Sequence, residues 1–121
     1  MTENYIYYDG FEGEPEYTFC LYDGNCPIEK IHLWDGYFGD IIDTIEPTEK
    51  GWTSLAEYYQ LCLELENDNW KVPDIVVALD QLMNVDKTKI KFPKSHEILK
   101  LLIEMFIKAC ENNLTVYIEY F

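Results

Sequence analysis

The C-terminal segment Leu114–Phe121 alternates strictly in its side chains, with Leu114, Val116, Ile118 and Tyr120 on one face. A period of two residues is that of a β-strand with one buried face. A strand cannot satisfy its backbone hydrogen bonds alone, so this one needs a neighbouring strand. The other candidate strands all lie in the first fifty residues. We therefore expect the chain to cross the intervening segments and return to an N-terminal sheet.

The first fifty residues alternate short β-type runs with turns. Three runs are rich in aromatic and β-branched residues and end at an Asp-Gly step: 5–8, 16–22 and 31–34. Glycine accepts positive φ and aspartate bonds its own backbone, so these steps predict turns. A fourth candidate strand, 40–45, stops before Pro47. The runs predict short antiparallel strands.

Between residues 51 and 112 the apolar positions recur at helical spacing. The pattern predicts helices over about 54–67, 73–84 and 95–111. Ser54 and Glu57 have the spacing of a capping box, and Ser95 is expected to cap the third helix. The pair Asn112-Asn113 suits a left-handed end to that helix. The lysine-rich segment 85–94 is predicted to be a loop.

These elements together predict an α+β fold, with an antiparallel sheet from the N-terminal strands and the C-terminal strand packed against about three helices. A chain of 121 residues is long enough for one ordinary domain and too short for two. We expect a single domain over 1–121, with 1–50 mainly strands and turns, 51–112 helical and 114–121 the terminal strand. Its 16% aromatic content argues against intrinsic disorder.

Charge is distributed unevenly along the chain. There are 23 acidic residues against nine basic ones, all of them lysine, so the formal net charge is −14. Residues 1–70 hold sixteen of the acids and only two lysines, whereas residues 71–121 hold seven of each. The same first part holds 14 of the 19 aromatic residues. Acidic and aromatic side chains therefore occur together.

This charge excludes several classes of partner. An acidic chain without arginine lacks the charge that neutralises phosphates, so we expect no nucleic-acid partner and no membrane-surface partner. The N-terminus has no basic stretch followed by an apolar one, and no apolar run reaches the roughly 18 residues of a membrane span. These features predict a cytoplasmic protein. Homo-oligomerisation is left open, because an alternating strand can pair in another chain as well as in its own.

The four cysteines, at positions 20, 26, 62 and 110, have irregular spacing and no secretory signal accompanies them. They are predicted to be reduced and mostly buried. A structural zinc site at Cys20, Cys26 and His32, or a cysteine nucleophile beside a histidine, is a weaker interpretation because each position has a simpler role. The chain has no Gly-rich phosphate loop, no G-x-S-x-G and no H-E-x-x-H. No catalytic residue, metal ligand or cofactor is predicted, and the protein is not expected to be an enzyme.

Candidate partner-binding residues come from the acidic and aromatic first part. The segment Asp9–Glu16 is dense in carboxylates, which suits either a solvated loop or docking to a basic partner, and a cation site is a weaker possibility. Tyr37 and Phe38 lie in a glycine-flanked turn, where two large rings are costly to expose unless a partner covers them. Alternatively, this turn folds back onto the first helix. The predicted set is Asp9, Glu12, Glu14, Glu16, Asp23, Asp35, Tyr37, Phe38, Asp40 and Asp43.

The chain resembles immunity proteins of bacterial polymorphic toxin systems in its size and acidity. The resemblance also rests on the three predicted strands that end at Asp-Gly steps and on the segment Gly51–Tyr59 (G-W-T-S-L-A-E-Y-Y). The resemblance is greatest to those paired with contact-dependent growth-inhibition toxins. It implies a cognate basic toxin domain, neutralised by stoichiometric binding in the cytoplasm, and it assigns no role to any single residue. A nuclease is the expected toxin, because its positive charge serves to hold phosphates. The alternatives are an acidic adaptor or DNA mimic that binds a basic host protein, and a small metal-dependent hydrolase.

Overall fold

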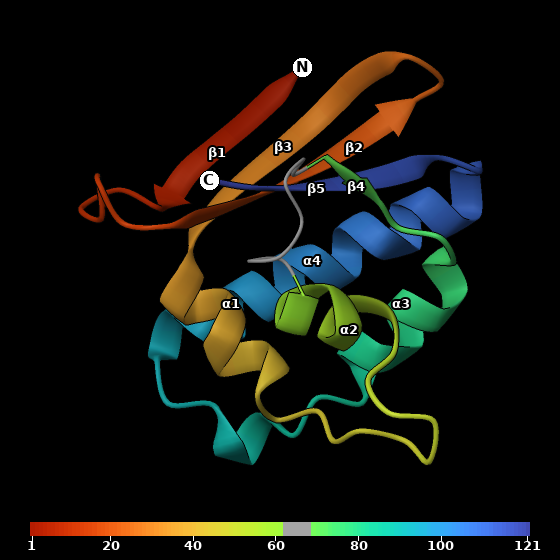
Figure 1. Ribbon diagram of the computed structural model, residues 1–121. Helices are drawn as coiled ribbons and strands as arrows, with labels where there is room; N and C mark the ends of the chain where they lie inside the picture. Colours follow the sequence, from red (N-terminus) through yellow and green to blue (C-terminus); the bar gives the residue numbers. More distant parts are fainter. Residues whose placement is uncertain (62–68) are drawn as a thin grey trace.

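The computed structural model describes residues 1–61 and 69–121, and it confirms the α+β class (Figure 1). The elements in this described part follow one another as β1 (Thr2–Tyr7), β2 (Glu16–Asp23), β3 (Cys26–Trp34), α1 (Asp35–Ile42), α2 (Ser54–Leu61), β4 (Trp70–Lys71), α3 (Ile75–Met83), the short 3₁₀ helix η1 (Lys87–Lys89), α4 (Pro93–Asn112) and β5 (Thr115–Tyr120). The predicted end of the first helix at residue 67, and Cys62 within it, lie outside the described residues.

The sheet is mixed, which corrects the expectation of a purely antiparallel one. Its strand order is β1-β3-β2-β5-β4, with β2 antiparallel to both β3 and β5 and with β1 parallel to β3. The reason is that β1 does not pair with β2, the next strand along the chain. It lies instead at the far side of the β2–β3 hairpin, where Glu3 is opposite Lys30.

The C-terminal strand pairs with the N-terminal sheet, as its alternation predicts. In the ladder between β5 and β2, Ile118 is opposite Phe19 and Val116 is opposite Leu21, and all four side chains are fully buried. Two segments nearly a hundred residues apart in sequence therefore form the middle of the sheet.

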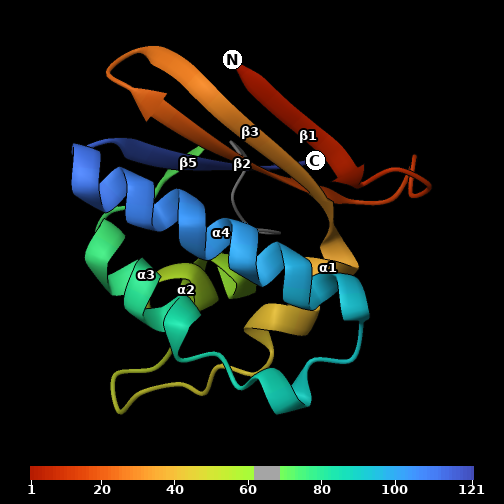
Figure 2. The ribbon, with the colours of Figure 1, turned by 180° about the vertical axis from the view of Figure 1, so that it is seen from behind.

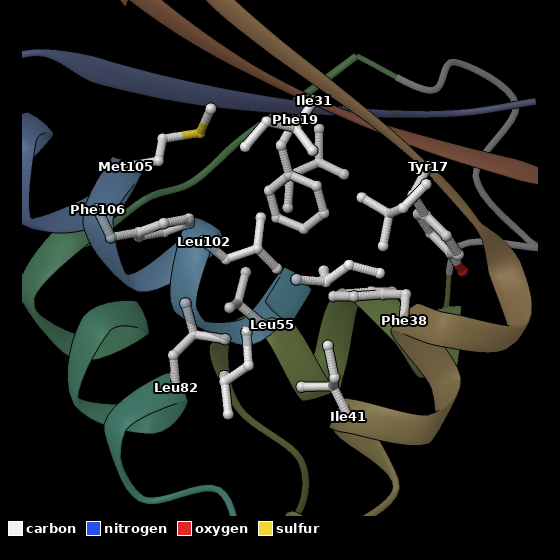
Figure 3. Close-up of a cluster of buried hydrophobic side chains, with 14 of the residues drawn as sticks. Tyr17, Phe19, Ile31, Phe38, Ile41, Leu55, Leu82, Leu102, Met105 and Phe106 are labelled. Carbon is white, nitrogen blue, oxygen red and sulfur yellow. The ribbon is translucent and has the colours of Figure 1, made fainter. Parts of the chain in front are cut away.

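The helices lie against one face of the sheet (Figures 1 and 2). Side chains from that face and from α1 to α4 form one core, in which Phe19, Phe38, Leu55, Leu82 and Phe106 are fully buried (Figure 3). Each helix contributes one apolar side to this core, as amphipathic helices do. The opposite face of the sheet carries no helix among the described residues.

Helices α3 and α4 lie approximately where the sequence predicts helices, but the N-terminal ends of α2 and α4 differ from the prediction. The αL conformation of Asn113 (φ 54°) ends α4 as expected. This helix begins at Pro93, however, so Ser95 lies within its first turn and is not the cap. At α2, Ser54 has a φ of 52° and its buried hydroxyl makes no hydrogen bond within the described residues, so the capping box does not form.

Helix α1 replaces a predicted turn and a predicted strand. The segment Asp35–Ile42 is helical, and Gly36 and Gly39 lie inside it rather than in turns. A Cβ at Gly36 would overlap the Trp34 ring, and one at Gly39 would lie 2.6 Å from the Tyr59 hydroxyl. Both glycines therefore allow aromatic rings to pack closely on the helix backbone. The Asp-Gly step predicted a turn here instead.

The cysteines only partly match the prediction of buried thiols. Cys20 is fully buried, and its burial raises the pKa of its thiol to about 11, so it is protonated at neutral pH. Cys26 is exposed at the start of β3, and Cys110 is exposed because the buried stripe of α4 ends at Ala109.

Candidate partner-binding site

The structure gathers some of the predicted site residues and separates others. Glu14 and the three aspartates of the α1 segment lie near the start of β2, whereas Asp23 lies in the β2–β3 turn. An eight-residue strand separates these two ends of β2, a span of roughly 23 Å. Asp23 therefore does not share a surface with the others.

A hollow of about 260 Å³ lies beside α1, and we call it the acidic hollow. Helices α1 and α2 and the segment before α4 form its walls. The lining residues are Asp35, Gly36, Gly39, Asp40, Asp43, Tyr59, Lys91 and Phe92. Three of the predicted carboxylates thus share one concave surface with two aromatic rings.

Asp35, at the first position of α1, is held in an unfavourable environment. Burial raises the pKa of its carboxyl group above the ordinary value, and the charges of Asp43 and Glu14 raise this pKa further. The positive end of the helix dipole favours an acid at this position, but it does not outweigh these effects. The ionised Asp35 therefore makes the folded protein less stable, and a cation in the hollow would relieve this cost.

Asp40 has a structural role that its sequence position did not reveal. Its carboxylate accepts hydrogen bonds from the backbone N–H groups of Lys91 and Phe92 at 3.0–3.1 Å. Although partial burial raises the pKa of Asp40, these two backbone donors, together with the Ser95 side chain and the charge of Lys91, leave the pKa below its ordinary value. Asp40 thus joins α1 to the start of α4, whose N-cap residue has no side-chain cap of its own.

Four aromatic rings pack together next to the acidic hollow, and we call them the aromatic cluster. Phe11 stacks on Trp34 with 4.3 Å between ring centroids, and Phe92 contacts the edges of Trp34 and Tyr37 at 5.8 and 5.7 Å. Phe92 is 40% exposed, and Phe11 and Trp34 are half-buried. The cluster therefore offers apolar surface at the edge of the carboxylates.

The rings proposed as exposed anchors are not available on the surface. Tyr37 is 7% exposed and Phe38 is fully buried, because α1 turns Phe38 inward against Tyr17 and Tyr59. This agrees with the alternative that the segment packs onto the first helix predicted from the sequence, which is α2. The surface rings are instead Phe11 and Phe92, which the sequence analysis missed. Phe11 lies in the acid-dense segment, which was a usable signal, whereas nothing marked Phe92 within the lysine-rich loop.

Glu16 belongs to a different group, on the helix-free face of the sheet. There His32 Nε2 lies 3.0 Å from Glu3, and His32 Nδ1 lies 3.1 Å from the Thr18 hydroxyl and 3.4 Å from Glu16. The Tyr5 ring stacks on His32, and its hydroxyl donates to Glu3 at 2.7 Å. This bond and the one to His32 lower the pKa of Glu3. The group links β1 to β3 and β2, so Glu16 has a structural environment apart from the hollow.

The remaining predicted acids, Asp9 and Glu12, are exposed in the loop between β1 and β2. Glu12 accepts a hydrogen bond from the backbone N–H of Gly10 at 3.3 Å, and bonds of this kind lower the pKa of its carboxyl. The same loop carries Phe11 of the aromatic cluster. Asp9 and Glu12 therefore lie at the margin of the site.

Few carboxylates in the described part of the chain have a lysine partner. Within residues 1–61 and 69–121, a single Lys–carboxylate ion pair forms, between Lys108 and Glu29 at 3.6 Å. Lys91 lines the acidic hollow but lies beyond ion-pair distance of its carboxylates. Asp35 and Asp43 therefore have no lysine partner within this part of the chain, whereas the charge of Lys91 favours the ionised form of Asp40.

Over the described ranges, no group of three or more His, Cys, Asp or Glu residues is arranged to hold a metal ion. No helix in those ranges has the length and apolarity needed to cross a membrane. No family model matches the chain, and neither a curated protein nor a solved structure matches it.

Proposed function

We propose that this chain is an inhibitor of the immunity type, which neutralises a basic toxin domain by stoichiometric binding in the cytoplasm. The observation that carries the proposal is the acidic hollow beside the aromatic cluster, where carboxylates without lysine partners adjoin partly exposed rings. Complementary charge speeds the encounter of two proteins, and desolvated aromatic rings then supply affinity. A nuclease domain is the expected partner, because it must be positively charged to hold phosphates.

Asp35 supports the idea that the hollow receives a cationic side chain. Burial and two neighbouring carboxylates disfavour its charged form, so an ionised Asp35 lowers the stability of the fold. A lysine or arginine of the partner would neutralise Asp35 and Asp43 together. The exposed ring of Phe92 would add a cation–π contact at the rim.

The arrangement of the acids favours an inhibitor over a DNA mimic. A mimic is expected to space its carboxylates along an elongated face, as phosphates are spaced along a duplex. Here the acids of the hollow gather around apolar rings, while Asp23 and Glu16 lie apart with other neighbours. Such clustering around an apolar centre is typical of a protein–protein interface with anchor residues.

The neighbouring reading frame provides the first experiment. Its product, or the C-terminal domain of that product, is expressed in a bacterial host with and without this chain. We expect growth arrest in the absence of the chain, rescue in its presence, and a 1:1 complex by size-exclusion chromatography with light scattering. A harmless neighbour, or arrest that the chain does not relieve, would contradict the immunity interpretation.

A matched pair of charge reversals then tests the surface. Asp43→Lys alters the hollow and Asp23→Lys alters the remote turn, and both change the net charge by the same amount. We expect Asp43→Lys to slow association by about tenfold at low salt and to weaken its salt dependence, because local charge steers the encounter. Asp23→Lys should have a much smaller effect in the same stopped-flow measurement. Equal effects would show that only net charge matters and would contradict a located interface.

A further inference from the structure

A second hollow, of about 410 Å³, lies on the outward side of α4, the helix that crosses the front of Figure 2. We call it the α4 groove. Its lining residues are Lys87 from η1 and His96, Leu99, Lys100, Ile103 and Glu104 from α4. None of them lines the acidic hollow, so the groove is a separate surface and its interpretation does not depend on the proposed function.

The α4 groove carries two lysines at one end, and at the other end it carries Ile103 together with the carboxylate of Glu104. His96 and Lys100 lie one turn apart on α4, and Lys87 joins them from η1. Ile103 follows on the same side of the helix, and Ile107, 36% exposed, lies one further turn along. Charge and apolar surface therefore succeed each other along a single helix face.

The two lysines of the groove lack an internal counter-charge. Over residues 1–61 and 69–121, neither Lys87 nor Lys100 forms an ion pair, and Glu104 does not come within ion-pair distance of Lys100 although it is four residues away. Leu99, 1% exposed, contributes the apolar floor. Residues 71–121 as a whole are electrically neutral, so the strong acidity of the protein is concentrated elsewhere.

We propose that the α4 groove binds an amphiphilic anion, a carboxylate that carries an unbranched acyl chain. The carboxylate lies between Lys87 and Lys100, and the chain covers Ile103 and Ile107. Ile107 is seven residues beyond Lys100, about 10 Å along the helix axis, so an acyl chain of medium length spans the apolar end. The volume of the groove falls in the range of small-molecule sites.

The test is a titration of the whole chain with decanoate below its micelle concentration, followed by ¹H–¹⁵N NMR. We expect saturable shifts confined to α4 and η1. Lys87→Gln and Lys100→Gln should each weaken binding by about two- to fivefold, the effect of a partly exposed ion pair. Glu104→Gln should tighten binding by about twofold, because a carboxylate at the groove repels the ligand. These are exposed positions, so the variants are expected to fold, and circular dichroism verifies this.

Three controls separate this ligand from other causes. Lys94→Gln removes an equal charge from the first turn of α4 outside the groove and should leave decanoate binding unchanged. Acetate, which lacks the chain, and decyltrimethylammonium, which has the opposite charge, should not produce the α4 shifts. Absence of saturable shifts with decanoate, or an equal loss for Lys94→Gln and Lys100→Gln, would overturn the proposal. Occupation of the groove by an acidic amphipathic peptide but not by decanoate would overturn it in favour of a protein partner.

Discussion

Helices α1 and α4 pack against each other, but different interactions hold them. Helix α4 has twenty residues, a regular buried stripe, a proline at its first position and a left-handed asparagine at its end. Helix α1 has eight residues, two internal glycines and an acid in its first turn. Isolated helices shorter than about 12–15 residues are marginal in water, so α1 depends on its neighbours for its existence.

The contrast shows how the protein separates stability from surface chemistry. The lysines of α4 lie on its exposed side, and its inward stripe forms much of the core. In α1 the inward residues Phe38 and Ile41 hold the helix in place, while Asp35 in its first turn occupies a position that costs stability. The site we propose for a partner is therefore built on the helix that is least able to form by itself.

We expect the largest effect from a substitution that disrupts the packing of α1. Phe38→Ala should lower the free energy of unfolding by about 3–5 kcal/mol, because it leaves a cavity beneath the helix. Phe92→Ala is the control, since that ring is 40% exposed and its loss should cost much less. Urea denaturation followed by circular dichroism measures both. Similar losses for the two variants would show that α1 is not held by its buried face.

A second substitution tests whether helix propensity determines the stability of α1. Alanine favours helices over glycine by about 1 kcal/mol, so propensity alone predicts that Gly36→Ala stabilises the protein. We expect a loss of about 1–3 kcal/mol instead, because the new Cβ overlaps the Trp34 ring. In a double-mutant cycle, Trp34→Ala should remove most of this cost. A stabilising Gly36→Ala would contradict the close approach.

A third change tests the link from α1 to α4. Asp40→Asn should cost about 1–2 kcal/mol at neutral pH, because the charged acceptor of two backbone N–H groups is lost. The folded-state pKa of Asp40 lies below its ordinary value of 3.8, so the wild type holds this contribution above pH 3.8 and loses it as the pH falls through the folded-state pKa. The difference between variant and wild type should therefore shrink in acid. Asp43→Asn, whose side chain is exposed, should show no such link to α4.

The smallest expected effect has the opposite sign. Because the folded-state pKa of Asp35 is raised, the ionised form lowers stability as the pH rises through that pKa. Asp35→Asn should therefore stabilise the protein at neutral pH, by at most about 0.5–1 kcal/mol given partial hydration. The same variant should bind the partner more weakly. A thermal melt across pH checks the first statement, and an unchanged melting temperature at neutral pH would show that Asp35 is under no electrostatic strain.

The elements that the sequence predicts well are those whose pattern is local. The helix α4, the strand β5 and the turns at Gly10 and Gly24, both with positive φ, follow from periodicity and turn chemistry. The parallel pairing of β1 does not, because it depends on contacts such as that between Glu3 and His32, 29 positions apart. Nor does α1, where the glycines serve ring contacts rather than a turn.

The candidate site was predictable in charge but not in geometry. Composition located the acids in the first part of the chain, and Asp35, Asp40 and Asp43 indeed share one hollow. The aromatic rings beside these acids could not be predicted, because they depend on which rings the fold buries. Phe38 is buried, and the ring beside the acids is instead that of Phe92, more than fifty positions away. Long-range packing of this kind leaves no mark in a local pattern.

The pairing of β2 with β5 also affects when the sheet can form during synthesis of the chain. About a hundred residues separate the two strands, and ribosomes add roughly 5–20 residues per second, so β2 waits about 5–20 seconds for its partner strand. Throughout that interval Phe19 and Leu21 lack the strand that later covers their edge of the sheet. The chain can therefore complete its sheet, and with it the proposed binding surface, only some seconds after its acidic N-terminal segments have been synthesised.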